Sequence, residues 1–184
     1  MAKVYVFLAN GFEDIEALAP VDILRRGGIE VVTVSINDER DVESAHGVIV
    51  IADATFDTVG DLCDADLLVL PGGMPGAKNL NEHEGVRQAI LNQQAQGKRI
   101  AAICAAPLVL GGLGLLQGKK ATCYPGFENT LTGAEYTAEP VTVDGNITTG
   151  KGPGAAMAFG YQLLAHFTDE RVVKTLKQGM MYLE

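Results

Sequence analysis

The amino-acid sequence predicts an α/β fold built on a mainly parallel central sheet. Three short apolar runs, at residues 4–9, 66–70 and 100–103, have the length and continuity of strands buried on both faces. Segments with helical spacing of apolar residues lie between them. Because buried strands alternate with helices along the chain, neighbouring strands are expected to run parallel in one layered sheet.

The first third of the chain predicts a strand, a helix and a second strand. The run at residues 4–9 ends at Asn10 and Gly11, and residues 13–26 then carry apolar side chains at helical spacing. Pro20 is expected to kink this helix, and two glycines to end it. Residues 30–35 are rich in β-branched side chains and predict a strand. Residues 48–51 predict part of a small hairpin.

The rest of the chain repeats this alternation. The expected strands lie at residues 66–70, 100–103 and, more weakly, 120–124, and the expected helices at residues 84–96, 154–167 and 169–180. Residues 141–149 predict a hairpin that turns at Asp144 and Gly145. With no repeat, linker or low-complexity tract, residues 1–184 are expected to form a single domain.

Composition excludes several classes of protein. The net charge of -9 argues against a nucleic-acid partner, which normally requires a basic surface. No apolar run is long enough to span a bilayer, so a membrane partner is not expected. Cys63, Cys104 and Cys123 form no metal-binding pattern, and no metal or other cofactor is expected. An odd number of cysteines without an export signal predicts reduced thiols and a cytoplasmic location.

Cys104 is the strongest candidate for a reactive residue. An apolar strand-like run ends abruptly at this thiol, and small residues, a proline and a helix-like stretch follow it. This pattern is typical of a nucleophile elbow, which holds one side chain above the end of a sheet. The positive end of the following helix would favour the thiolate. The alternative is a buried cysteine that acts as a small hydrophobe. Cys63 and Cys123 lack the elbow pattern and are expected to be ordinary packing or surface residues.

Other chemical groups are expected beside Cys104. Acidic residues 13–16, a Pro-Gly-Gly turn at 71–73 and a glycine-rich loop at 150–154 also follow predicted strands, and parallel strands bring such segments to one edge. Glu16 falls among apolar residues, so its buried carboxyl would stay protonated and exchange a proton with the sulfur. Glycines 72 and 73 form either a plain turn or, with the amide of Ala105, an oxyanion hole. Lys151 offers a cation, in a loop that lacks the P-loop spacing.

The histidines give no clear catalytic base. A cysteine–histidine hydrolase requires an imidazole near the thiol. None of His46, His83 and His166 neighbours Cys104 in the sequence, and only His46 is not readily dismissed.

Several ordered segments together resemble the ThiJ/PfpI superfamily, in the branch of the human parkinsonism-linked redox protein. The resemblance runs from Lys3 to the final helix, and its segments are GFEDIE (11–16), PVDILRRGG (20–28), LPGG (70–73), AAICAAP (101–107) and GPG (152–154). It implies a flavodoxin-like three-layer sandwich with a nucleophile elbow, and a homodimer. It also implies that Cys104 is reactive and Glu16 is its protonated partner, that Gly73 and Ala105 supply backbone donors, and that Gly152 and Pro153 wall the pocket.

The chain departs from this family's pattern near the site. Tyr124 stands where the branch often has a histidine, so proton transfer by histidine is not carried over; Tyr124 is expected to hydrogen-bond a substrate. His46 and Lys151 stand where the human-like branch has anion-binding arginines, whereas Arg26 is retained. The protease branch has a histidine directly after the cysteine, where this chain has Ala105.

The leading hypothesis is a cofactor-independent cysteine enzyme that converts a small reactive carbonyl, such as methylglyoxal, to a hydroxy acid. Cys104 and Glu16 are its expected catalytic residues, and Gly72, Gly73, Ala105, Tyr124, Gly152 and Pro153 its pocket. The family also suggests an oxidative-stress sensor or chaperone without a dedicated substrate. A cysteine hydrolase or peptidase, or a protein of thiazole monophosphate biosynthesis, is disfavoured.

Overall fold

A seven-stranded sheet forms the centre of the protein, in a computed structural model that describes residues 2–182. Its strand order is β10-β11-β7-β6-β1-β2-β5, and every neighbouring pair is parallel except β10 and β11. The strands are β1 (Lys3–Leu8), β2 (Glu30–Ser35), β5 (Ala54–Thr55), β6 (Leu67–Leu70), β7 (Arg99–Ile103), β10 (Val141–Asp144) and β11 (Ile147–Gly150). The predicted mainly parallel sheet is therefore confirmed.

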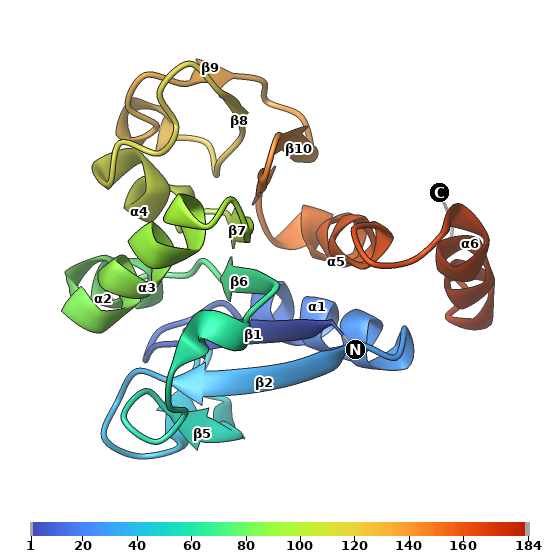
Figure 1. The fold of residues 1–184 in the computed structure, drawn as a ribbon, viewed down its shortest axis with the longest axis horizontal. Helices are drawn as coiled ribbons and strands as arrows, with labels where there is room; N and C mark the ends of the chain where they lie inside the picture. Colours follow the sequence, from blue (N-terminus) through green and yellow to red (C-terminus); the bar gives the residue numbers. More distant parts are fainter. Residues whose placement is uncertain (1, 183–184) are drawn as a thin grey trace.

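Helices cover both faces of this sheet (Figure 1). On one side α1 (Asp14–Arg26) packs against α5 (Ala156–Ala165), which in turn contacts α6 (Glu170–Gly179). On the other side α2 (Gly76–Glu82) contacts both α3 (Glu84–Ala95) and α4 (Pro107–Gly112). The result is the three-layer α/β/α arrangement that the sequence predicts.

Two small sheets are added to this core. The hairpin of β3 (Asp41–Glu43) and β4 (Ile49–Ile51) is antiparallel, and β8 (Lys120–Ala121) pairs in parallel with β9 (Glu135–Tyr136). The strand expected over residues 120–124 is thus only two residues long. It stops because the next amides find other partners: Thr122 N donates to Thr149 Oγ1 and Tyr124 N donates to the Cys104 carbonyl.

Helix α1 carries the capping groups that its sequence suggests. The Glu13 carboxylate accepts a hydrogen bond from the Glu16 amide and caps the helix, while acidic residues occupy its first turn and Arg25 and Arg26 its last. The helix continues through Pro20 and ends at Gly27. A Cβ at Gly160 of α5 would lie only 2.7 Å from Cδ1 of Ile23, so this glycine allows α1 and α5 to pack closely.

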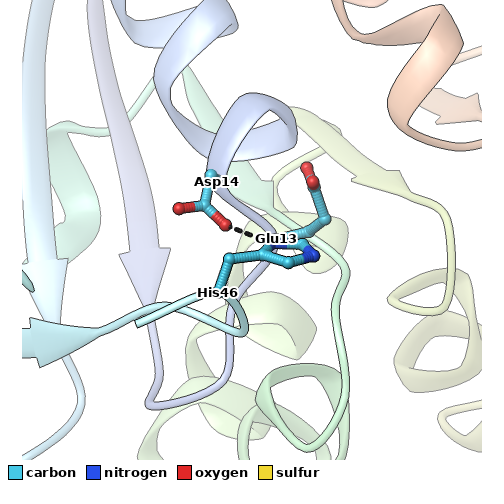
Figure 2. A group of neighbouring side chains, drawn as sticks. All are labelled: Glu13, Asp14 and His46. Atoms are coloured by element: carbon cyan, nitrogen blue, oxygen red, sulfur yellow. Dashed lines mark hydrogen bonds and ion pairs between the residues drawn. The ribbon is translucent and has the colours of Figure 1, made fainter. Parts of the chain in front are cut away.

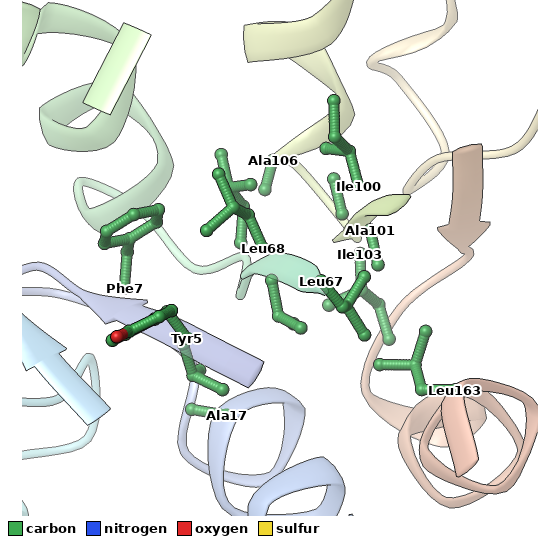
Figure 3. Close-up of a cluster of buried hydrophobic side chains, with 14 of the residues drawn as sticks. Tyr5, Phe7, Ala17, Leu67, Leu68, Ile100, Ala101, Ile103, Ala106 and Leu163 are labelled. Atoms are coloured by element: carbon green, nitrogen blue, oxygen red, sulfur yellow. The ribbon is translucent and has the colours of Figure 1, made fainter. Parts of the chain in front are cut away.

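The main core lies between the sheet and its helices (Figure 3). Tyr5 and Phe7 of β1, Leu67 and Leu68 of β6, and Ile100 of β7 are all at most 2% exposed. Because side chains of one strand alternate between its two faces, burial on both faces requires the continuous apolar runs that mark these strands in the sequence. Within residues 2–182 no helix is both long enough and apolar enough to cross a membrane.

Strands β1, β6, β7 and β11 all end at the same edge of the sheet, because each is parallel to the next. The segments that follow them carry Glu16, Gly72, Cys104 and Gly152. The predicted convergence of these segments is confirmed, and it places the candidate site at the carboxyl edge of the sheet.

Candidate active site

Cys104 sits at the sharp turn that directly follows β7. Its φ of 65° lies in the left-handed region, which is rare and strained for a residue with a side chain. The main chain is held on both sides: the amide donates to the Gly150 carbonyl over 2.9 Å, and the carbonyl accepts from Tyr124 N over 2.9 Å. These contacts support the strained turn that the nucleophile elbow requires. The side chain is 7% exposed, so only a small part of it is open to solvent.

Glu16 is buried in the first turn of α1, beside Cys104. It is 0% exposed, and its Oε2 accepts a hydrogen bond from Gly72 N over 3.0 Å. Its Oε1 is also buried and makes no hydrogen bond of good geometry to any described nitrogen or oxygen. The thiol of Cys104 does interact with this carboxyl. The structure therefore brings together the two residues that sequence analysis selected as a catalytic pair.

The two groups change each other's proton affinity. Burial raises the pKa of Glu16 to about 7, although the Cys104 thiol and the Gly72 amide partly oppose this. Burial and then the negative charge of Glu16 raise the pKa of Cys104 to about 12, against the lowering effect of the Gly73 and Ala105 amides. The expected depression of the Cys104 pKa is therefore wrong. The following helix, α4, has only six residues and begins at Pro107, three residues after Cys104.

The pair consequently carries one negative charge between about pH 7 and pH 12, and near pH 7 its singly charged and uncharged forms are both well populated. Two adjacent buried anions would repel each other, so the carboxyl and the thiol titrate as a coupled unit with one mobile proton. A carboxyl with a pKa of about 7 is well suited to accept and return that proton near neutral pH.

Gly72 and Gly73 are required by close packing around the pair. A Cβ at Gly72 would lie 2.5 Å from both Cys104 Cβ and Glu16 Oε2, so no side chain fits there. Gly73 has a φ of +85°, and its amide and that of Ala105 interact with the Cys104 sulfur. The same two N–H groups can donate hydrogen bonds to the oxygen of a substrate whose carbon becomes bonded to the sulfur.

Tyr124, Gly152 and Pro153 lie together in an adjacent surface pocket of about 320 Å³. Tyr124 is 46% exposed, and a Cβ at Gly152 would meet its ring at 3.0 Å. Lys151 also lines this pocket, but its Nζ donates to the Ala138 carbonyl over 3.0 Å. The ammonium group of Lys151 is therefore already engaged in a hydrogen bond.

The histidines are all held by groups other than Cys104. His46 Nδ1 contacts Asp14 Oδ2 at 2.7 Å, and His83 Nδ1 accepts from Val86 N. His166 Nε2 contacts Thr148 Oγ1 at 2.9 Å, and burial, followed by the charge of Arg99, lowers its pKa to about 4. Within residues 2–182 of this chain, no imidazole is placed to act as the base of a cysteine hydrolase.

A cluster of Glu13, Asp14 and His46 lies at the start of α1 (Figure 2). Its potential ligand atoms lie within 4.8 Å of one another, so these are described side chains that could together hold a metal ion. Hydrogen bonds already account for the arrangement, because Asp14 accepts from Ser44 and contacts His46 while Glu13 caps α1. The contacts also fasten the β3–β4 hairpin to the start of α1. Sequence analysis did not find this cluster, because His46 is distant in the chain from Glu13 and Asp14.

The fold and the site together define a class of protein: an α/β sandwich with a strained elbow cysteine paired to a buried glutamate. Residues 2–166 match the model of the DJ-1/PfpI family, and the chain belongs to that family.

Relatives of this chain are named as DJ-1 proteins, a glyoxalase and a deglycase. It is 40% identical over 164 residues to protein DJ-1 homolog B of Arabidopsis thaliana, which covers 88% of this chain but only 37% of that relative. It is 32% identical to the glutathione-independent glyoxalase DJ-1 of Schizosaccharomyces pombe, covering 99% of this chain and 97% of the relative. A deglycase of Pyrococcus horikoshii is 37% identical, with 85% of this chain and 94% of that protein covered.

Solved structures agree with this assignment. A DJ-1 superfamily protein of Salmonella typhimurium superposes with a TM-score of 0.95 at 35% identity, over 100% of both chains. Oxidized DJ-1 of Toxoplasma gondii superposes with a TM-score of 0.94 at 36% identity, again over 100% of both chains. The predicted family and fold are confirmed by these likenesses.

Proposed function

We propose that this protein is a cysteine-dependent enzyme that converts small reactive dicarbonyls, such as methylglyoxal, to hydroxy acids. The observation that carries the proposal is the buried contact between Cys104 and Glu16, whose pKa of about 7 allows it to exchange protons at neutral pH. Full-length relatives named as a glyoxalase and a deglycase support the same class of reaction.

The reaction begins with a bond between sulfur and the aldehyde carbon. As Cys104 Sγ attacks, its proton passes to the Glu16 carboxylate, and the aldehyde oxygen becomes an oxyanion that the Gly73 and Ala105 amides stabilise. Protonation of that oxygen gives a hemithioacetal. We expect Tyr124, whose side chain is 46% exposed and whose backbone amide donates to the Cys104 carbonyl, to hydrogen-bond the substrate's second carbonyl.

The next steps move hydrogen within the substrate. Glu16 removes the proton from the former aldehyde carbon while the neighbouring carbonyl oxygen gains a proton, which gives an enediol. Return of a proton to the neighbouring carbon and loss of the proton from the hydroxyl on the former aldehyde carbon then give a thioester. Water then cleaves the thioester, giving the hydroxy acid and the free thiol. One carbon is oxidised while its neighbour is reduced, so the atoms and electrons balance with water as the only co-reactant.

A turnover assay with methylglyoxal tests this proposal. The wild type is expected to form lactate, Cys104→Ser to lose essentially all activity, and Cys63→Ser, which changes an exposed thiol, to keep it. Full activity of Cys104→Ser contradicts the mechanism, and a lack of turnover in the wild type contradicts the substrate class.

Regulation by oxidation is a second candidate function for the same thiol. Its support is the carboxyl next to Cys104, which when protonated can donate a hydrogen bond to an oxidised sulfur. The likeness to a relative solved in an oxidized state adds to this support. Peroxide would oxidise the thiolate first to a sulfenic acid and then, with a second equivalent, to a sulfinate, releasing water each time.

We also propose that the protein forms a homodimer through the β3–β4 hairpin and the adjoining start of α1. Ile15 of α1 is 51% exposed, and Ile49 and Ile51 of β4 are 64% and 66% exposed. The contacts of Asp14 with Ser44 and His46 hold the two elements together, so their apolar side chains belong to one part of the surface. A second copy is the favoured occupant because the resemblance implies a homodimer.

The dimer is tested by light scattering after gel filtration. The wild type is expected to have twice the monomer mass and Ile49→Asp the monomer mass. Val143→Asp, at another exposed apolar residue, on β10, is expected to stay dimeric. A monomeric wild type, or a dimer that survives Ile49→Asp, overturns this interface.

A further inference from the structure

Arg99 lies at the opposite end of β7 from Cys104. The strand begins at Arg99 and ends at Ile103, so its two ends place these residues at opposite edges of the sheet. At the edge near Arg99, a pocket of about 390 Å³ is lined by Asp66, Gly97, Lys98, Arg99, Gly145, Asn146 and Phe167. The pocket therefore lies where β6, β7 and β11 begin, away from the proposed reaction site.

The guanidinium of Arg99 differs from those of most other arginines in the chain. Arg25, Arg26 and Arg87 each form an ion pair, and Arg40 donates to the Ala52 carbonyl. Among residues 2–182, the Arg99 side chain forms no ion pair or hydrogen bond, although the residue is half-buried. Arg171 has none either, but it is exposed on α6 and is well hydrated. A partly desolvated guanidinium without an acidic partner is a strong donor for an incoming anion.

The surroundings of Arg99 favour a negative ligand. Lys98 contributes a second positive charge, and its Nζ is held by the Cys63 carbonyl rather than by an acid. The single acid of the lining, Asp66, is exposed and accepts a hydrogen bond from the backbone amide of Lys3. His166 lies within electrostatic reach of Arg99 and stays neutral at neutral pH, so it does not add charge.

The pocket also leaves room for a ligand to approach. A Cβ at Gly97 would meet nothing within 4 Å, and one at Gly145 only Lys119 Nζ at 3.4 Å. Phe167 adds an apolar wall. The geometry points to a binding site for the phosphate group of a small molecule, in which Arg99 makes the main charge-assisted hydrogen bonds and Lys98 supplies supporting charge. This inference is independent of the proposed dicarbonyl reaction.

Calorimetric titration with inorganic phosphate, and then with glycerol phosphate, tests the site and separates its two possible ligands. The wild type is expected to bind saturably, and Arg99→Leu to bind about tenfold or more weakly. Arg171→Leu, which removes the same charge elsewhere, is expected to bind like the wild type at matched ionic strength. Tighter binding of glycerol phosphate than of inorganic phosphate identifies a phosphate ester as the ligand; equal binding identifies the free ion.

A second measurement keeps the test valid if Arg99→Leu is poorly folded. Phosphate bound at Arg99 would offset its charge, so the NMR titration of the His166 ring in the wild-type protein is expected to move to higher pH. Arg99→Lys should show weaker binding but a similar shift at saturation. Any of three results would overturn the proposal. They are a wild type that does not bind phosphate saturably, a His166 titration that phosphate does not move, and an equal loss of phosphate affinity in Arg99→Leu and Arg171→Leu.

Discussion

Glu16 Oε2 accepts a hydrogen bond from the Gly72 amide over 3.0 Å, and this buried contact joins the first turn of α1 to the end of β6. It fixes the carboxyl beside Cys104, whose thiol interacts with the same carboxyl group. The fold therefore holds the two groups that share a proton in a fixed relative position.

Replacing Glu16 by Gln should lower kcat for methylglyoxal by about a hundredfold or more, because the amide cannot accept and return the proton. The Gly72 amide can still donate to the Gln oxygen, so the site is expected to keep its shape. Glu13→Gln provides the matched control, since an amide oxygen can still cap α1, and its kcat should stay close to that of the wild type. A Glu16→Gln enzyme with unchanged kcat would contradict the proton-transfer role.

The rate should depend on pH through the same carboxyl. If ionised Glu16 accepts the thiol proton, kcat/KM rises with pH through about 7, the raised pKa of Glu16. Steady-state kinetics across this range give the midpoint. A profile that is flat through neutral pH would show that another group accepts the proton.

Stability should change with pH in the opposite sense. The pKa of Glu16 is raised from 4.5 to about 7 in the folded protein, so between these values the unfolded chain loses a proton that the folded chain retains. Stability therefore falls as pH rises across this window, by an amount on the order of 3 kcal/mol. The difference in the free energy of unfolding between wild type and Glu16→Gln isolates this effect, because contributions from His166 cancel. A difference independent of pH would contradict the raised pKa.

Gly72→Ala should disrupt the pair by crowding. Its Cβ would lie 2.5 Å from Glu16 Oε2 and 2.8 Å from the Ile103 carbonyl oxygen, so the backbone or the carboxyl must shift. We expect a loss of about 1–3 kcal/mol of stability together with most of the activity. Gly179→Ala, where a Cβ meets nothing within 4 Å, should be neutral or slightly stabilising in chemical denaturation. Equal stability of the two variants would contradict the crowding.

Peroxide should oxidise Cys104 ahead of the other two thiols, as measured by mass spectrometry of peptides. The pKa of Cys104 is itself raised to about 12, so the expected selectivity depends on its neighbours: the Glu16 carboxylate can take the thiol proton as the sulfur reacts, and the Gly73 and Ala105 amides interact with that sulfur. Cys63 and Cys123 have no such arrangement; a hydrogen bond to Asp61 raises the pKa of Cys63, and burial raises that of Cys123 to about 11. Glu16→Gln should reduce the yield of sulfinate at Cys104. Equal modification of Cys63 and Cys104 would count against an oxidation-sensitive site.

Much of the fold could be predicted because its strands are buried on both faces. The apolar runs ending at Asn10, Pro71 and Cys104 mark parallel strands, and parallel strands bring their carboxyl ends to one edge. Helix α2 was not predicted, since its sequence GAKNLNE has little apolar periodicity and includes a glycine and two asparagines.

The sequence predicted which residues form the site better than it predicted their pKa values. The sequence order suggested that Cys104 and Glu16 meet, but burial depends on contacts made across the whole fold, and burial reverses the expected direction of the Cys104 pKa. The pocket at Arg99 forms where β6, β7 and β11 begin side by side, and the residues at these positions form no recognisable sequence motif. His46 was a candidate base until its contact with Asp14 placed it elsewhere.

The left-handed backbone at Cys104 has a consequence for evolution and for protein engineering. A conformation that glycine would adopt readily costs a cysteine on the order of 1–3 kcal/mol, so the protein gives up stability to hold a thiol at this turn. Retention of the thiol at this position in natural variants would be a sign of selection for its reactivity rather than for packing.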